Sequence, residues 1–413
     1  MNIDALDSRE YELDNGLKVI TIKKDTKIAS VQLGIKAGPI YEKIDEKGMS
    51  HFIEHMLFKG TDKRNNENIN EALEDRGGSY NAYTTYTSTV FGLCGLQEEL
   101  SSSVEILSDM IMNSTFPVEE LKKEKSVILA EIRNGVDDVE HLSFNKINEY
   151  AFSKSHLRYD IAGSEALINS FTKEDLFDFY KRFYIPNNSV ISIVSSYEHD
   201  EAGKLVKEYF NSWKKQELIE TDIIDEDNMS MEKTTYKNDI EQNTILFLYT
   251  FYGLDEKEEL ALDILNYKLG ESANSILFME LREKRGMAYD VYSDTDRTKH
   301  IKTMYIYTSV GESDVEEAKS TIENIIKDIL NNKINIDEKS IIHMKKVMKT
   351  GIISMIEDGD SLCNYSLHQK LSGKKVDEFL YDLKELESID SEMIHFVAKK
   401  VLKEPTVHIL RGN

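Results

Sequence analysis

The five residues His51-Phe52-Ile53-Glu54-His55 place two imidazoles and a carboxylate at a spacing suited to hydrolytic chemistry. The pattern from about 47 to 60 predicts a helix, on which His51, Glu54 and His55 share one face. Imidazoles at i and i+4 can bind one tetrahedral Zn²⁺, and a catalytic zinc needs a third protein ligand and an open position for water. Glu54 is placed to take a proton from that water. The alternative is a histidine pair with no metal, on a helix surface or in a core.

The longer segment from His51 to Thr61 reads His-Phe-Ile-Glu-His-Met-Leu-Phe-Lys-Gly-Thr. It resembles the signature of the inverzincin metallopeptidases, the family of pitrilysin, insulysin and the mitochondrial processing peptidase. The resemblance implies a third zinc ligand, a glutamate about 76 residues after the second histidine, and Glu131 stands at that spacing. It also implies a supporting glutamate seven residues earlier, which Glu124 matches. Seven residues are about two helical turns, so both carboxylates can face one site.

A second match lies in the other half of the chain. The segment from Leu281 to Tyr289 resembles the Arg–Tyr element of the same family, in which the two residues are seven apart. The resemblance implies that Arg282 and Tyr289 hold the substrate near the metal. The chemistry fits, because a guanidinium and a phenol can both donate to a carbonyl oxygen as it gains charge.

A third match is the segment from Tyr80 to Tyr86, which resembles the substrate-binding edge strand of the family. The resemblance implies that Asn81, Ala82, Tyr83 and Thr84 contact the substrate. A peptide that joins a sheet edge gains main-chain hydrogen bonds that do not depend on its sequence. The alternative is that tyrosine and threonine simply form good strands, whether or not a peptide binds.

Length, charge and cysteine content limit the class of protein. A chain of 413 residues predicts two domains of about 200 residues each. Acidic side chains outnumber basic ones by 75 to 51, and the net charge of −24 argues against nucleic-acid partners. Two distant cysteines, Cys94 and Cys363, fit a reducing compartment. The first residues lack the pattern of a signal peptide and no 18-residue apolar run occurs, so we expect a cytoplasmic protein without a membrane partner.

The order of the predicted elements indicates a duplication. Two strands within 10–38 precede helices near 47–60 and 66–76, strands within 80–96, and helices near 98–112 and 117–134. The C-terminal half repeats this plan with a strand at 244–249, helices near 256–269 and 274–284, strands from 288 and at 304–310, and a helix near 314–330. Segment 112–120 is echoed at 330–338.

We therefore predict an α+β fold of two homologous domains, each a mostly antiparallel sheet packed against helices. The predicted boundaries are an N-terminal catalytic zinc domain at 1–212, an acidic linker at 213–238, and a C-terminal domain without the zinc motif at 239–413.

These observations favour a zinc-dependent endopeptidase with one Zn²⁺ per chain, acting on short or unstructured peptides. The length resembles family members that work as a dimer of half-length subunits enclosing a chamber, so we expect a homodimer and leave open a heterodimer with a homologous subunit. By the same resemblance, Arg282 and Tyr289 of one subunit act at the zinc of the other. The alternative function is a partner subunit that binds peptides or scaffolds an active homologue, and the intact pentad argues against it.

Overall fold

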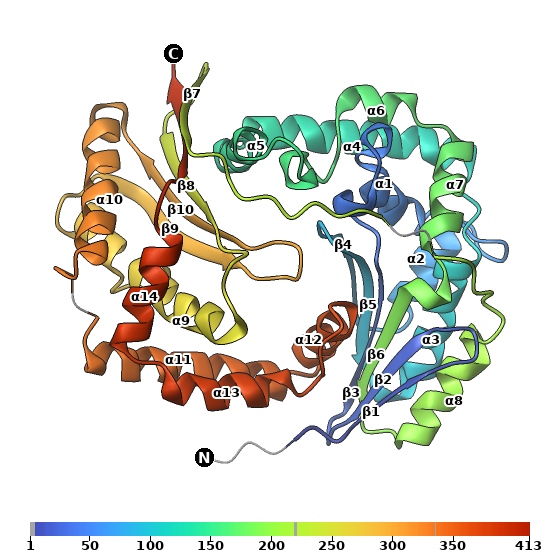
Figure 1. Ribbon diagram of the computed structural model, residues 1–413. Helices are drawn as coiled ribbons and strands as arrows, with labels where there is room; N and C mark the ends of the chain where they lie inside the picture. Colours follow the sequence, from blue (N-terminus) through green and yellow to red (C-terminus); the bar gives the residue numbers. More distant parts are fainter. Residues whose placement is uncertain (1–4, 219–220, 335) are drawn as a thin grey trace. The chain divides into compact units, whose positions relative to one another are not determined.

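The structure is a computed structural model that describes residues 5–218, 221–334 and 336–413 (Figure 1). The chain divides into two compact units, and each unit takes segments from both halves of the sequence. The first unit holds Met1–Ile132, Asp160–Asp222 and Ile352–Leu380, and the second holds Arg133–Tyr159, Ile223–Gly351 and Tyr381–Asn413.

The first unit is built on a six-stranded sheet with strand order β1-β2-β6-β3-β5-β4. β2 and β6 run parallel, and every other neighbouring pair is antiparallel. β4 forms one edge and pairs with β5. The strands are β1 (Ser8–Glu12), β2 (Lys18–Lys23), β3 (Ile28–Ile35), β4 (Ser79–Thr84), β5 (Thr89–Leu96) and β6 (Ser189–Ser195).

Helices cover both faces of this sheet. One face packs against a set of helices that begins with α1, and the other packs against α12. A Cβ added at Gly34 on β3 would stand 2.8 Å from a methyl group of Leu371, so this glycine lets α12 approach the sheet closely. The helices of the unit are α1 (Met49–Met56), α2 (Asn66–Glu74), α3 (Leu100–Met112), α4 (Val118–Asp137), α6 (Glu165–Ser170), α7 (Lys173–Phe183), α8 (His199–Phe210) and α12 (Gly359–Leu371).

The second unit is built on a five-stranded sheet with strand order β7-β11-β8-β10-β9. Its strands are β7 (Met231–Lys237), β8 (Asn243–Thr250), β9 (Ala288–Asp296), β10 (Thr303–Val310) and β11 (Thr406–Gly412). One face packs against α9, α10 and α14, and α5 lies against β8 and β11. The helices are α5 (Val139–Ala151), α9 (Glu256–Asn266), α10 (Val315–Leu330), α11 (Glu338–Glu357), α13 (Glu378–Ser388) and α14 (Ser391–Val401), of which α11 and α13, like α4, cross a unit boundary.

The two sheets repeat one topology. The order β2-β6-β3-β5-β4 in the first matches β7-β11-β8-β10-β9 in the second, and each begins with a parallel pair followed by antiparallel pairs. α5 and α12 occupy corresponding places after the second long helix of each repeat, and each packs on the sheet of the other repeat. The predicted α+β class, with two related and mostly antiparallel sheets, is confirmed.

The units differ from the continuous domains predicted at 1–212 and 239–413. Residues 133–159 belong to the second unit and residues 352–380 to the first, because α5 and α12 are exchanged between the repeats. The predicted linker at 213–238 also differs, since Met231–Lys237 forms β7 and pairs with β11. β7 is an edge strand, and most of its residues are polar and exposed. Its sequence therefore lacks the apolar residues by which a buried strand is predicted. Among the described helices, none is long and apolar enough to cross a membrane.

Candidate metal centre

Helix α1 presents the pentad as a fixed polar face. Met49, Phe52, Ile53 and Met56 are buried in the core of the first unit, and each such side chain contributes roughly 1.5–3 kcal/mol by burial. The Glu42 carboxylate accepts hydrogen bonds from the main-chain amides of Gly48 and Ser50. These two amides at the start of the helix therefore have an acceptor that the helix itself does not provide. Burial of one face and the capped start together hold the opposite face in place.

Gly48 allows the chain to enter α1. Its φ of +94° is left-handed, and a Cβ there would lie 2.6 Å from the carbonyl oxygen of Ala162. A glycine is therefore required at the residue before the helix, for both conformation and space.

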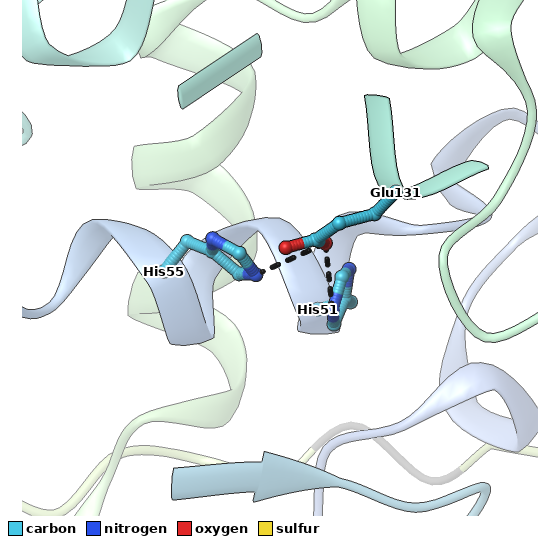
Figure 2. A group of neighbouring side chains, drawn as sticks. All are labelled: His51, His55 and Glu131. Atoms are coloured by element: carbon cyan, nitrogen blue, oxygen red, sulfur yellow. Dashed lines mark ion pairs between the residues drawn. The ribbon is translucent and has the colours of Figure 1, made fainter. Parts of the chain in front are cut away.

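His51, His55 and Glu131 converge in the first unit. Figure 2 shows the Glu131 carboxylate, from α4, directed at the two rings of α1. Nε2 of His51 lies 3.8 Å from Oε2 of Glu131, and Nε2 of His55 lies 3.5 Å from the same oxygen. We call these three residues the His–His–Glu cluster. Its ligand atoms all lie within 4.8 Å of one another.

The donor set fits zinc. A tetrahedral Zn²⁺ with bonds of about 2.0–2.1 Å separates its ligand atoms by about 3.3 Å. The two nitrogen-to-oxygen distances of 3.8 and 3.5 Å are slightly longer than this value. Two imidazole nitrogens and one carboxylate oxygen leave a fourth position for a water or a substrate oxygen. Burial, together with the neighbouring His55, lowers the pKa of His51 to about 4, so its nitrogen lone pair is available at neutral pH.

Glu124 and Lys59 orient His55. Nδ1 of His55 donates to Oε2 of Glu124 at 3.1 Å, which leaves Nε2 facing Glu131. Lys59, one turn beyond His55, pairs with the other Glu124 oxygen at 2.9 Å. Burial raises the pKa of Glu124, but the hydrogen bonds from His55 and Lys59 outweigh this and hold that pKa below its usual range. A carboxylate that fixes the second nitrogen of a ligating histidine is the usual support of a zinc site.

Glu54 lies beside the cluster and is held by the sheet. The hydroxyl of Thr84, the last residue of β4, donates to Oε2 of Glu54 at 2.6 Å. Burial raises the pKa of Glu54, and the Thr84 hydrogen bond opposes this rise. The carboxylate predicted to act as the base is therefore tethered to the strand predicted to bind substrate.

The predicted substrate strand is an edge strand in the structure. Asn81, Ala82, Tyr83 and Thr84 lie in β4, which borders the first sheet and contacts α1. Its residues alternate between the faces of the sheet, so Ala82 and Thr84 point toward α1 while Asn81 and Tyr83 point toward α12. The position agrees with a role in peptide binding, and that role stays a prediction.

Arg282 and Tyr289 form a pair in the second unit. Arg282 lies on a π-helical turn, Phe278–Glu283, with its guanidinium 5.2 Å from the ring centre of Phe278. One guanidinium nitrogen donates to the main-chain carbonyl of Tyr289 at 3.0 Å, and the Tyr289 side chain is 72% exposed. The structure brings these two residues to each other, and their action at a zinc site stays a prediction.

Sequence reasoning missed two contributions to this centre, from Lys59 and Thr84, and one set of contacts on the opposite face of the sheet. Lys59 lies four residues after His55 within the quoted signature, so helical spacing was the available signal. The Thr84 hydroxyl was predicted as a substrate contact and not as the partner of Glu54. No sequence signal indicates that His368 and Asn364 of α12 contact Tyr83 of β4.

Comparison with known proteins identifies the family. The model of the insulinase family, peptidase family M16, matches residues 18–165, and the model of the peptidase M16 inactive domain matches residues 170–346. The uncharacterized zinc protease YmxG of Bacillus subtilis is 28% identical over 403 residues, covering 96% of each chain. An uncharacterized zinc protease of Rickettsia felis is 30% identical over 351 residues, covering 83% of this chain and 82% of its own.

Two further matches agree. The beta subunit of the mitochondrial-processing peptidase of Caenorhabditis elegans is 26% identical over 417 residues, covering 96% of this chain and 87% of its own. A crystal structure of a protease from Helicobacter pylori shares the fold with a TM-score of 0.92 at 18% identity, covering 98% of this chain and all of the other. The chain belongs to the insulinase family of peptidases, family M16.

Proposed function

We propose that this chain is a zinc-dependent endopeptidase that hydrolyses short or unstructured peptides. The observation that carries the proposal is the convergence of His51, His55 and Glu131 beside the carboxylate of Glu54. A bound Zn²⁺ supplies Lewis acidity, which lowers the pKa of water and polarises a peptide carbonyl. Relatives named as zinc proteases along most of the chain support the assignment.

The protein groups divide the remaining work. Glu54 accepts the proton of the attacking water, and Oε1 is the atom for this because Oε2 already accepts from Thr84. The Thr84 hydrogen bond restricts rotation of this carboxylate, since Thr84 lies on β4 and Glu54 lies on α1. Glu124 keeps the ring of His55 in the orientation that presents Nε2 to the cluster.

The edge strand suggests the class of substrate. β4 has β5 on one side and no further strand among the described residues on the other, so its outer main-chain groups suit an added strand. A peptide can pair there only if its own backbone is extended and unpaired. This requirement selects short or unfolded peptides over folded proteins.

We also propose that the working enzyme is a dimer that closes a chamber around the substrate. In this arrangement Arg282 and Tyr289 of one subunit donate to the substrate carbonyl at the His–His–Glu cluster of the other. The high exposure of Tyr289 supports the proposal, because the phenol is accessible. A homodimer is the simplest form, and a heterodimer with a homologous subunit meets the same requirement.

Two measurements on the purified chain alone test the function. We expect about one zinc per chain by elemental analysis and cleavage of a quenched fluorescent peptide, which a strong chelator stops and added Zn²⁺ restores. A chain that binds the peptide without cutting it, even when loaded with zinc, would instead be a binding or scaffolding partner of an active homologue.

A further inference from the structure

A pocket of about 590 Å³ opens on the first sheet, on the face opposite α1. Its floor is formed by β3, β4 and β5, and its wall by α12 and the end of α11. Gly92 on β5 is paired with Asn81 on β4. Because Gly92 has no side chain, the space above it is part of the pocket. This pocket is separate from the His–His–Glu cluster, because the two lie on opposite faces of the first sheet.

A continuous hydrogen-bond chain shapes the pocket. The Tyr83 hydroxyl lies 2.7 Å from Nε2 of His368 and accepts from the side-chain amide of Asn364. Asn364 also donates to Oε1 of Gln32 at 3.0 Å, and Nε2 of Gln32 donates to the Asp360 carboxylate at 3.0 Å. Because each side chain is held by the next, the lining is ordered before any ligand enters.

The geometry of β4 connects this pocket to a docked peptide. Ser79, Asn81 and Tyr83 point to the pocket, and Thr84 points to Glu54. A strand added to β4 lies about 4.8 Å farther out, and every second side chain of it faces the α12 side. Only a long side chain can pass over Ser79 and Asn81 from that distance. A peptide cut on the α1 face therefore offers alternate side chains to the pocket.

We propose that this pocket is a subsite for a lysine or arginine side chain of a peptide docked on β4, with the Asp360 carboxylate as its partner. Among the described residues that line the pocket, Asp360 is the only acid, and lysine and arginine are absent. The stem of such a side chain lies against Met355 and Val90, and its charged end reaches Asp360 on the first turn of α12. The proposal rests on the proposed function.

The electrostatics of the pocket support a cation. Burial is the main cause that raises the pKa of the Cys94 thiol at the floor, and the Asp360 and Asp358 carboxylates raise it further. Their negative potential therefore extends into the pocket. Burial lowers the pKa of His368, so this ring adds no positive charge at neutral pH. Lysine and arginine can lay an apolar stem along such a wall while keeping the charged end hydrated.

The test uses the full chain and a peptide series cut at a single bond. Each peptide of the series carries one test residue, which is lysine, arginine, norleucine or the short cation diaminopropionic acid. The test residue is placed at each position of the peptide in turn. We expect one position at which lysine and arginine raise kcat/KM by about fivefold over norleucine, a size typical of an exposed ion pair. Diaminopropionic acid should give no such gain, because its ammonium cannot reach Asp360. The gain should also shrink as salt increases.

Variants assign the effect to the pocket. Asp360→Asn should bring the lysine-to-norleucine ratio close to one, whereas Glu357→Gln, which removes an exposed charge three residues away but outside the lining, should keep it. A ratio that survives in Asp360→Asn, an equal gain from the short cation, or no basic preference at any position would overturn the subsite.

Binding to Glu54→Gln separates this proposal from the proposed function. If peptides bind that variant with an Asp360-dependent preference for lysine and the wild type cleaves nothing, the subsite stands and the peptidase assignment fails. If the wild type cleaves peptides without any dependence on Asp360, the peptidase assignment stands and the subsite fails.

Discussion

Replacing Glu124 with glutamine should weaken zinc binding by about 10- to 100-fold. Glu124 is buried, and its carboxylate accepts the Nδ1 proton of His55 at 3.1 Å. A hydrogen bond to a charged group contributes about 1.5–3 kcal/mol, and each 1.4 kcal/mol is about tenfold in affinity. Glutamine keeps the shape and a neutral acceptor, so the loss measures the charge of the carboxylate and the orientation it gives His55.

Competition with a fluorescent chelator at neutral pH measures this affinity. Glu131→Ala removes a ligand outright and should lose more affinity than Glu124→Gln. Glu119→Gln is the matched control, because it makes the same substitution on α4 at a side chain that is 77% exposed and pairs with Lys122, away from the His–His–Glu cluster. Zinc affinity of Glu124→Gln within about twofold of the wild type would refute the reasoning.

Three other predictions address the base, the assembly and the fold. Thr84→Val removes the hydroxyl that holds Glu54, so kcat should fall by about tenfold or more with little change in KM. Thr84→Ser keeps the hydroxyl and should retain activity. A kcat of the valine variant equal to that of the wild type would contradict this prediction. Mixing inactive Glu54→Gln chains with inactive Tyr289→Phe chains should restore hydrolysis at one of the two sites of each heterodimer, and no recovery after verified subunit exchange would mean that the site forms within one chain. His408 is fully buried, and burial lowers its pKa from 6.5 to about 4. Between these two pH values the unfolded chain binds more protons than the folded protein does. The free energy of unfolding that is present at neutral pH is therefore lost as the pH falls. We expect the free energy of unfolding, measured with urea at neutral pH and near pH 4, to fall by about 3 kcal/mol less in His408→Gln than in the wild type. An equal fall in the two proteins would exclude the mechanism.

The sequence predicted the parts of the metal centre that depend on local geometry. Helical periodicity alone placed His51, Glu54 and His55 on one face, because a turn of helix fixes their spacing. Glu131 came from the resemblance, since many glutamates on an acidic helix look alike by composition. The structure adds Lys59 and Thr84, whose contacts depend on how α1, α4 and β4 pack against each other.

The exchange of α5 and α12 was beyond the reach of the sequence. An amphipathic pattern tells which face of a helix is buried, but it does not tell which sheet buries it. The strand order repeats in both halves, so the sequence pattern alone does not assign either helix to one of the two sheets. The close approach of Leu371 to Gly34 belongs to the packing of α12, and such a fit is visible only in three dimensions.

The central claim, a zinc peptidase with Glu54 as its base, is tested most directly by Glu54→Gln with zinc content and peptide hydrolysis measured on the same sample. Glutamine cannot accept the proton, whereas His51, His55 and Glu131 remain to hold the metal. We predict wild-type zinc content and a loss of hydrolysis of about 10²- to 10⁴-fold. Hydrolysis near the wild-type rate in this variant, at full zinc content, would contradict the claim.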